Sequence, residues 1–298
     1  MKRVICTGLA VLDHVFYLQE IPKNPIKSFA SSYQIVGGGN AATAAVAISR
    51  AGGQAIFWGS LGDDLNGDII LSELKEFGVD IDDVNRLNGL NSSVSTVLID
   101  NMGERLITNS TDSNLLKKAD WLPLAKLKNS DAVLADLRWQ EGALKTLRRA
   151  SELGIPGVLD ADLAPIGLNE EVIKNASHVL FSKPALDEFT QGKSIVEALH
   201  WGSDINGGWV GVTEGSSGTR WLDNGKLKHV PAFNVETVDT LGAGDIFHGV
   251  FALSLAEGLF ENNALIRASA AAALGCSRFG GRKKIPLRKE IETLISQR

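Results

Sequence analysis

The chain is poor in cysteine and carries no excess of basic residues. Its two cysteines, Cys6 and Cys276, lie far apart, and no CxxC pair or cluster of cysteine and histidine occurs. A disulfide scaffold or a zinc site is therefore excluded as the organising feature, and both thiols are expected to be reduced. The net charge of −5 and the pI near 5.6 argue against nucleic acid as the main partner.

Segments that would cross a membrane are also missing. No apolar run reaches the roughly 18 residues that a membrane-spanning helix needs. The apolar start of the chain carries Asp13 early and has no small-residue cleavage site, so it is interpreted as a first strand and not as a signal peptide. We therefore expect no membrane partner and a cytoplasmic location.

Several familiar catalytic motifs are absent, among them HExxH and GxSxG. The segment QGKS at 191–194 is not a phosphate-binding loop, because Asp187 stands where the first glycine is required. VGGGNAAT is not a complete dinucleotide fingerprint, because Ala42 stands at its third glycine. No motif supports a metal centre held by protein ligands alone.

Strand-like and helix-like segments alternate along most of the chain. Apolar runs such as RVICTGLA, DAVLADLRW and SHVLFS are typical of buried parallel strands, and segments such as NAATAAVAISRAG and EGALKTLRRASELG are typical of helices. This alternation predicts an α/β fold with a doubly wound, mostly parallel sheet flanked by helices. Without a linker, repeat or low-complexity tract, residues 1–298 are expected to form a single domain.

Two regions break the alternation. Residues 14–35 contain two prolines and no helical period, and residues 92–109 read as a hairpin with IDNMGER as its turn. Both are expected to form strands outside the main sheet. Together they predict a small β-layer over one edge of the domain.

The segment DTLGAGD at 239–245 leads directly into the apolar run IFHGVFALSLA. An ordinary loop, a helix cap and an anion-binding catalytic turn all remain open, since Asp is favoured in the first turn of a helix. Gly242 and Gly244 allow the backbone to approach a ligand, and the N–H groups at the helix start would hold an anion. Asp245 beside such an anion hole is suited to accept a proton from a substrate hydroxyl, which favours the catalytic interpretation.

These segments resemble the signatures of the PfkB, or ribokinase-like, carbohydrate kinases. DTLGAGDIFHGVF is similar to the C-terminal signature of that family and VGGGNAATAAVAISRAG to its N-terminal glycine signature. GSLGDDLNGD at 59–68 and VTEGSSG at 212–218 also have equivalents, in the same order along the whole chain. The resemblance implies a ribokinase-like fold with a small β-sheet lid from about 14–35 and 92–109. It also implies ATP as phosphoryl donor, Mg²⁺, and phosphorylation of a sugar hydroxymethyl group.

The resemblance implies roles for individual residues. Asp245 would be the catalytic base, and Asp239, with carbonyls near Leu241, Arg278 and Gly280, would hold a monovalent cation such as K⁺. The other implied roles are the anion hole for Gly242, Ala243 and Gly244, the sugar contacts for Asp13, Gly38 and Asn40, and the nucleotide site for Thr213 and Gly215.

Two departures from the family pattern concern the substrate and the metal. Ala42 stands where many members carry an Asn that contacts the sugar. Ser182 and Ala185 stand at the usual Asn-x-x-Glu, which is associated with Mg²⁺ and phosphate. Mg²⁺ is therefore expected to rely more on water and phosphate oxygens, with Asp187 or Glu188 as the substitutes at hand.

The substrate is interpreted from polar residues near the expected lid and strand ends. Lys27, Asn109 and Arg138 would suit a phosphate or sulfonate at the far end of a sugar, because a buried Arg is costly unless an anion meets it. VGGGNAATAAVA, GERLITN and VLADLRW are similar to the branch of the family that phosphorylates 6-deoxy-6-sulfofructose. The alternatives are a kinase for a neutral sugar such as fructose or ribose, a nucleoside kinase, and a catalytically weak nucleotide-binding relative.

Two further expectations concern the surface. Family members often pair through their lids, which implies a homodimer. The basic run GGRKK at 280–284 is interpreted as a solvated loop.

Overall fold

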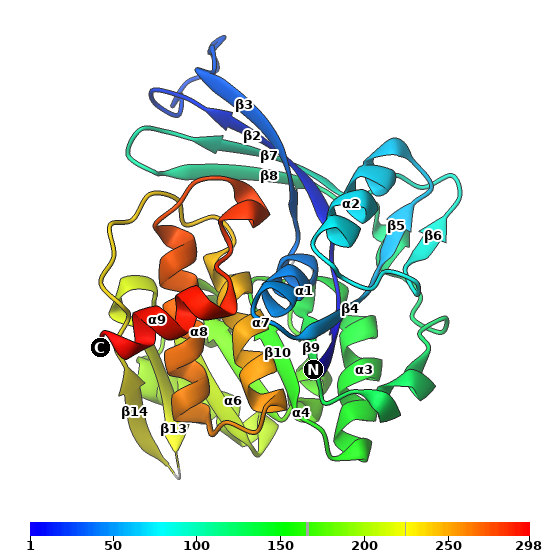
Figure 1. Cartoon of the computed structure of the whole chain (residues 1–298), viewed down its shortest axis with the longest axis vertical. Helices are drawn as coiled ribbons and strands as arrows, with labels where there is room; N and C mark the ends of the chain where they lie inside the picture. The colour runs from blue at the N-terminus through cyan, green and yellow to red at the C-terminus, as the bar shows by residue number, and fades with distance from the viewer. Residues whose placement is uncertain (165–166, 224) are drawn as a thin grey trace.

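An eight-stranded sheet forms the centre of the computed structural model, which describes residues 1–164, 167–223 and 225–298 (Figure 1). Across the sheet the strands are β14 (Lys226–Val230), β13 (Thr219–Asp223), β12 (Trp209–Thr213), β11 (His178–Ser182), β10 (Gly157–Ala161), β9 (Ala132–Asp136), β1 (Arg3–Thr7) and β4 (Gln54–Trp58). The strands from β12 to β4 run parallel, and β13 and β14 add an antiparallel hairpin at one edge. The predicted α/β fold class is confirmed.

Helices cover both faces of this sheet because its parallel strands are apolar on both sides. In β1, Val4 and Cys6 pack into one hydrophobic cluster, and the alternating residue Ile5 packs into the other. The first cluster includes residues of α1 (Asn40–Arg50), α2 (Leu65–Glu76), α7 (Ala243–Ala256), α8 (Glu261–Cys276) and α9 (Arg288–Ser296). The second includes residues of α3 (Gln140–Leu153), α4 (Glu170–Asn175), α5 (Lys183–Thr190) and α6 (Ile195–Asn206).

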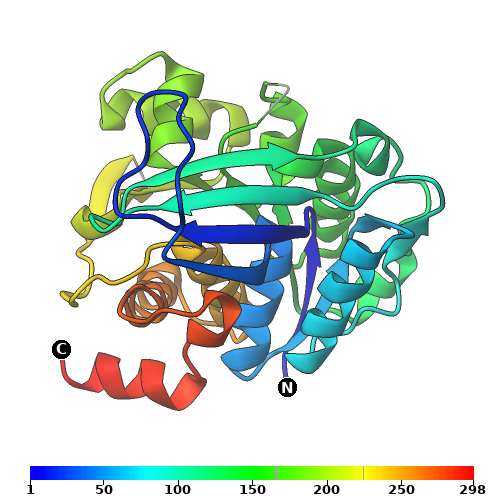
Figure 2. The same ribbon diagram turned by 90° about the horizontal axis from the view of Figure 1, so that it is seen from above.

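The second sheet has four strands and lies over the carboxyl edge of the central one (Figure 2). Its order is β3 (Ser32–Gly38), β2 (Val11–Tyr17), β7 (Val94–Ile99) and β8 (Arg105–Ser110). The two regions that break the alternation thus do supply strands outside the main sheet. A short pair, β5 (Ser60–Gly62) and β6 (Asn85–Leu87), flanks α2.

Local sequence explains several boundaries. Asp64 caps α2, since its Oδ1 accepts a hydrogen bond of 2.9 Å from the N–H of Gly67. The apolar run 54–62 is split at Gly59 into β4 and β5. The β13–β14 hairpin was not predicted, because β14 (KLKHV) is mostly polar and exposed and carries no buried-strand pattern.

Neither cysteine forms a disulfide in the described part of the chain. Cys6 is buried, Cys276 is partly buried, and both are free, as expected. Within the described residues, none of the helices combines the length and the apolar character needed to cross a bilayer.

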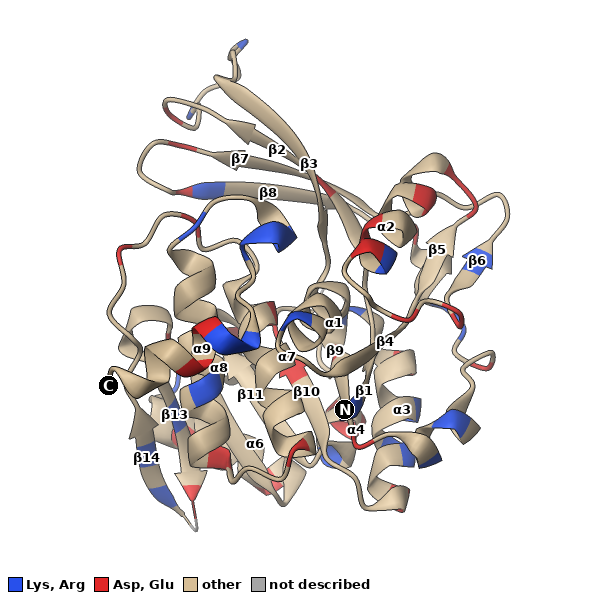
Figure 3. Ribbon diagram, viewed as in Figure 1, with Lys and Arg blue, Asp and Glu red and all other residues tan. Residues whose placement is uncertain are grey.

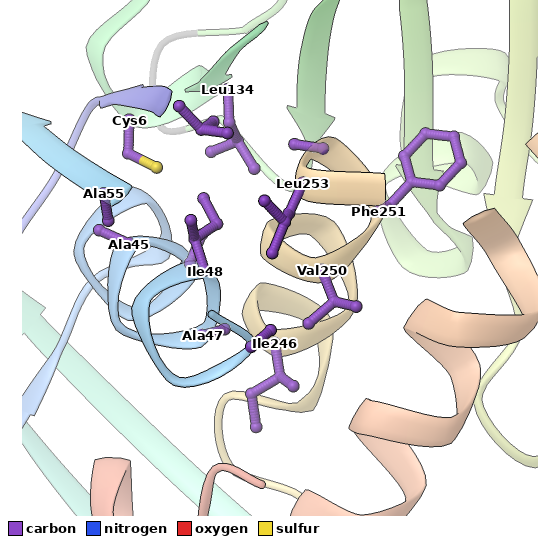
Figure 4. Close-up of a cluster of buried hydrophobic side chains, with 14 of the residues drawn as sticks. Cys6, Ala45, Ala47, Ile48, Ala55, Leu134, Ile246, Val250, Phe251 and Leu253 are labelled. Atoms are coloured by element: carbon purple, nitrogen blue, oxygen red, sulfur yellow. The ribbon is translucent and has the colours of Figure 1, made fainter. Parts of the chain in front are cut away.

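Helices α1 and α7 pack closely against each other, and their N-termini both point toward the carboxyl edge of the sheet. Ile48 of α1 and Leu253 of α7 point toward each other between the two helices (Figure 4). A Cβ at Gly249 would lie 2.5 Å from the carbonyl oxygen of Ala44, so only glycine permits this approach.

We expect Gly249→Ala to lower the free energy of unfolding by about 1–3 kcal/mol, because the added methyl group overpacks the contact between α1 and α7. The better helix propensity of Ala does not offset this clash. Denaturant unfolding measures the difference, with Glu76→Ala at an exposed position of α2 as the control. A Gly249→Ala variant as stable as wild type would show that the two helices can move apart freely.

Candidate active site

A cavity of about 330 Å³ opens where the central sheet meets the four-stranded sheet. Its wall follows the carboxyl ends of neighbouring parallel strands: Leu9 after β1, Arg138 after β9, Asp160 in β10, Ser182 in β11 and Thr213 in β12. The strand order reverses between β1 and β9, since β1 lies between β4 and β9. Ligands of open α/β sheets bind at this kind of reversal.

The N-terminus of α7 forms the floor of the cavity. Gly242 adopts a left-handed conformation with φ of 74°, which lets the chain turn into the helix. The N–H groups of Gly244 and Asp245 lie in the first turn, where a helix has no preceding carbonyl to accept them. A Cβ at Gly244 would meet no atom within 4 Å, so the backbone here borders open space. The predicted anion-hole residues Gly242, Ala243 and Gly244 therefore line the cavity together.

Asp245 is half-buried in the first turn of α7 and lies near three other carboxylates. Burial raises the pKa of Asp245 well above its ordinary value, and the negative charges of Asp160, Asp162 and Asp136 raise it further. The Arg282 guanidinium opposes this shift in the pKa of Asp245. A carboxyl group with a raised pKa at an anion-binding helix end is suited to accept a proton.

The three neighbouring carboxylates have different surroundings. Asp136 is buried and accepts backbone hydrogen bonds from Leu9 (2.9 Å) and Ala41 (3.1 Å), so it ties strand ends together. Burial raises the pKa of Asp136 to about 6. Asp160 accepts a 3.3 Å hydrogen bond from Asn40, and its Oδ1 lies 3.6 Å from Nδ1 of His248.

Asp162 accepts a 2.7 Å hydrogen bond from the hydroxyl of Ser182. It is only partly buried, unlike Asp136 and Asp160, and it lines the cavity. The sequence interpretation gave no role to Asp160 or Asp162. Their position directly at the end of a strand was the signal that marks them.

The opposite wall carries a row of polar residues on the four-stranded sheet. Asp13 on β2 pairs with Ser95 on β7, which pairs with Asn109 on β8, so all three side chains share one face. The amide of Asn109 donates to the Ser95 hydroxyl at 3.1 Å. Burial raises the pKa of Asp13, while a hydrogen bond from Ser95 opposes the shift. Ser95 was missed in the sequence because a lone serine in a strand carries no motif.

Gly38 and Asn40 complete this part of the cavity. A Cβ at Gly38 would lie 2.0 Å from the Asp13 carboxylate, so the absence of a side chain makes room for that group. Asn40 begins α1 and points its amide at Asp160. Asp13, Gly38, Asn40 and Asn109, all predicted to face the sugar, thus line one cavity.

Arg138 also lines the cavity and is incompletely paired. Its Nη2 lies 3.6 Å from Oδ2 of Asp162, too far for a hydrogen bond. Its Nε is buried and has no hydrogen-bond partner among the described residues. Such a guanidinium has donors available for an anionic or hydroxylated ligand.

Three predicted residues, Lys27, Gly215 and Asp239, lie outside the cavity lining. Lys27 is exposed on the connection between β2 and β3, which extends into solvent, and its ammonium lies 5.7 Å from the centroid of the Phe29 ring. Gly215 is exposed just beyond β12, whereas Thr213 at the strand end does line the cavity. The sequence predicts which strands Lys27 and Gly215 follow, but it does not show whether the loops that carry them extend into the cavity or into solvent.

Ser182 and Ala185, which replace the usual Asn-x-x-Glu, lie in different surroundings in the structure. Ser182 faces the cavity and Asp162, but Ala185 is buried inside α5, and Asp187 pairs with Lys183 on the same helix. The expected substitutes are thus absent from the cavity lining, and Asp162 is the carboxylate next to Ser182. No cluster of three potential metal ligands exists within the described ranges.

The basic run 280–284 is not a solvated loop, and that interpretation is wrong. Arg282 is 2% exposed and its guanidinium contacts Glu73 at 2.9 Å and the carbonyl of Gly38 at 2.7 Å. Lys284 is 3% exposed, and its ammonium lies 2.8 Å from the Asp239 carboxylate, the group expected to hold a monovalent cation. Gly280 and Gly281, which begin this run and have positive φ, allow it to fold back toward the cavity.

Comparisons with known proteins agree with this geometry. The model of the pfkB family carbohydrate kinase matches residues 1–288. A ribokinase from Bacillus subtilis is 30% identical, covering 99% of this chain and all of the relative, and an ATP-dependent ribose-1-phosphate kinase from Halopiger xanaduensis is 29% identical, covering 100% and 99%. The crystal structure of a ribokinase-like protein from Agrobacterium tumefaciens superposes with a TM-score of 0.94 at 39% identity, covering 99% and 98% of the two chains.

The family match spans nearly the whole chain and includes every strand end that lines the cavity. Members of this family are phosphotransferases with an alcohol group as acceptor. The chain belongs to the PfkB family of carbohydrate kinases.

Proposed function

We propose that the chain transfers the γ-phosphoryl group of ATP to the primary hydroxyl group of a sugar, with Asp245 as the general base. The observation that carries the proposal is the position of Asp245 in the first turn of α7, beside N–H groups that border open space. The ATP-dependent relative from Halopiger xanaduensis supports ATP as the donor.

The cavity suggests where the two substrates bind and how the phosphoryl group passes between them. The sugar would bind against the row of Asp13, Ser95 and Asn109, and ATP would approach from the side of Ser182 and Thr213. Asp245 accepts the proton of the sugar hydroxyl, while that oxygen forms a bond to the γ-phosphorus. The bond between the γ-phosphorus and the bridging oxygen breaks, and its electron pair leaves with ADP. The first N–H groups of α7 stabilise the charge on the phosphoryl oxygens.

The donor set of the cavity fits Mg²⁺ bound mainly through the nucleotide. Mg²⁺ prefers oxygen ligands and usually keeps several waters, with one or two carboxylates and the substrate phosphates. Asp162, accepting from Ser182 at 2.7 Å, is the side chain that would hold it or its water. When bound, the ion would neutralise charge on the phosphates next to four carboxylates.

For the substrate we infer an anionic group at the far end of a ketose, as in 6-deoxy-6-sulfofructose. The Arg138 side chain supports this inference, because it lines the cavity, remains partly exposed and approaches Asp162 only to 3.6 Å. Arg105 and Asn109 on β8 line the same cavity and add donors. Lys27 is left out of this contact set because of its exposed position.

A neutral sugar is the second candidate. The Bacillus subtilis relative is a ribokinase, and Asp13 and Asn40 are groups that bind sugar hydroxyls equally well. A neutral substrate would leave Arg138 paired only with Asp162. The two candidates therefore differ in what Arg138 contributes to catalysis.

We also propose that a second copy of the chain covers the outer face of the four-stranded sheet. Tyr33, Ile35 and Leu106 are exposed on its outer strands, and the strand register puts them on the face opposite to Asp13 and Asn109. These strands carry few charged residues (Figure 3). An apolar face of this kind is typical of a contact between subunits.

Asp245→Asn is expected to lower kcat by about 10²–10⁴ because the amide cannot accept the hydroxyl proton. The melting temperature should not fall, since the substitution removes a negative charge from a group of four carboxylates. Steady-state kinetics and thermal unfolding measure both effects. A variant with nearly normal kcat would reduce Asp245 to a helix cap.

The pH dependence of kcat/KM should show an acid limb above the ordinary carboxyl range of about 4. Below its raised pKa, Asp245 is protonated and cannot act as a base. Asp162→Asn removes a like charge, lowers the pKa of Asp245 and should move the limb to lower pH. Asp187→Asn, outside the cavity, serves as the control and should leave the limb in place. A limb unmoved by Asp162→Asn would contradict this assignment.

Arg138→Ala should lower kcat/KM for sulfofructose by on the order of 10²-fold or more and barely affect fructose, because only the anionic substrate loses a charged partner. Substrate kinetics of both proteins on sulfofructose, fructose 6-phosphate, fructose and ribose make the comparison. The KM for ATP, measured in parallel, controls for an effect through Asp162. Wild type that prefers a neutral sugar, or an equal loss on all four, would favour the neutral candidate.

A further inference from the structure

Lys284 is a buried cation that contacts one residue twice. Its ammonium lies 2.8 Å from Oδ2 of Asp239 and donates to the backbone carbonyl of the same residue at 2.9 Å. The side chains of both residues are nearly inaccessible to solvent, at 2% and 5% exposure. Removing an ammonium group from water costs free energy unless the group is paired and hydrogen-bonded. The contacts with Asp239 therefore determine where the Lys284 ammonium lies.

The contacts of Lys284 fix the start of the loop that becomes the anion hole. The other carboxylate oxygen of Asp239 accepts a 2.8 Å hydrogen bond from the N–H of Leu241, next to Gly242. The N–H groups of Val238 and Asp239 donate to the carbonyl of Cys276 at 2.8 and 3.0 Å. Asp239 thus connects the end of α8 with the turn before α7. The ammonium group of Lys284 neutralises the Asp239 carboxylate.

The neighbouring cation Arg282 has a different set of partners. It contacts Glu73, the carbonyl of Gly38 and, at 3.4 Å, the hydroxyl of Thr43. These contacts connect α2, the end of β3 and α1, so Arg282 supports the sugar side of the cavity. Lys284, by contrast, contacts the loop 239–242 through Asp239.

We propose that Lys284 is a positioning residue that acts as a built-in monovalent cation, holding the loop 239–242 so that the first N–H groups of α7 face the transferring phosphoryl group. The proposal rests on the proposed function. It replaces the free cation expected at Asp239 with the side chain of the protein itself. Phosphoryl transfer by the wild type should therefore be insensitive to added K⁺ or NH₄⁺.

The test compares two substitutions that remove the charge but differ in the space they leave. Lys284→Ala leaves room for a small cation beside Asp239, whereas Lys284→Met fills most of that room. Lys283→Ala, an exposed neighbour, is the control. Each protein is assayed with ATP and its best sugar in a buffer whose only cation besides Mg²⁺ is bulky, such as choline, and then with increasing NH₄⁺ or K⁺.

Both substitutions at Lys284 should lower kcat by about 10²-fold, because misplacement of a group by about 1 Å has an effect of this size. Added NH₄⁺ or K⁺ should raise the kcat of Lys284→Ala at least about tenfold, because a factor of ten corresponds to one cation-carboxylate contact of ordinary strength. The same addition should change the kcat of Lys284→Met little. Wild type and Lys283→Ala should not respond. The KM for the sugar should change little in all four proteins.

Thermal unfolding supplies a readout that does not depend on turnover. NH₄⁺ or K⁺ should raise the melting temperature of Lys284→Ala and leave that of Lys284→Met and wild type unchanged. If Lys284→Ala folds only in an ammonium buffer, that dependence also supports the proposal. If wild type phosphorylates no sugar, the proposed function fails, and the cation-dependent melting temperature still decides the role of Lys284.

Three results would overturn the proposal. The first is a wild type that needs K⁺ or NH₄⁺ for activity, and the second is full kcat in Lys284→Ala and Lys284→Met without added cation. The third is an equal response of all proteins to the cation, because that would show a general salt effect.

Discussion

The structure depends on one constraint: carboxylates must lie next to the N-terminus of α7 without occupying the N–H groups that are to bind an anion there. Asp245 must stay close to the N–H groups that are to bind a phosphoryl group, and Asp136, Asp160 and Asp162 lie nearby. Carboxylates at this density repel one another and would repel a nucleotide. Arg282, which is nearly fully buried, offsets this repulsion at Asp245, while the equally buried Lys284 neutralises Asp239 next to the loop.

Packing around α7 serves the same requirement. The close approach of α1 at Gly249 sets the position of both helix N-termini, and the left-handed Gly242 aims the loop into the cavity. Asp136 then ties the strand ends to the start of α1 through Leu9 and Ala41. Catalytic groups on rigid elements keep their geometry without contact to the ligand, which is the condition for preorganised charge stabilisation.

Local patterns made much of the fold and of the site predictable from the sequence. Parallel strands buried on both faces read as continuous apolar runs, and DTLGAGD marks a helix start by its glycines and acids. The residues on strand ends, such as Arg138 and Thr213, could be located because parallel strands end at one edge. What the sequence could not show depends on tertiary contacts. The burial of Arg282 and Lys284 follows from acids that are distant in the chain, and a basic run alone is typical of a solvated loop. The reach of the connection that carries Lys27 depends on loop conformation, which has no local signal.

In the proposed reaction the first turn of α7 binds the transferring phosphoryl group while Asp245 contacts the sugar hydroxyl. The most direct measurement is a crystal structure with ADP, Mg²⁺, aluminium fluoride and the best sugar, because the fluoride mimics the transferring group. We predict fluoride atoms about 2.7–3.1 Å from the N–H groups of Gly244 and Asp245, with an Asp245 carboxylate oxygen at hydrogen-bond distance from the acceptor hydroxyl. A fluoride group bound away from α7, or an Asp245 side chain turned back to cap the helix, would contradict the account.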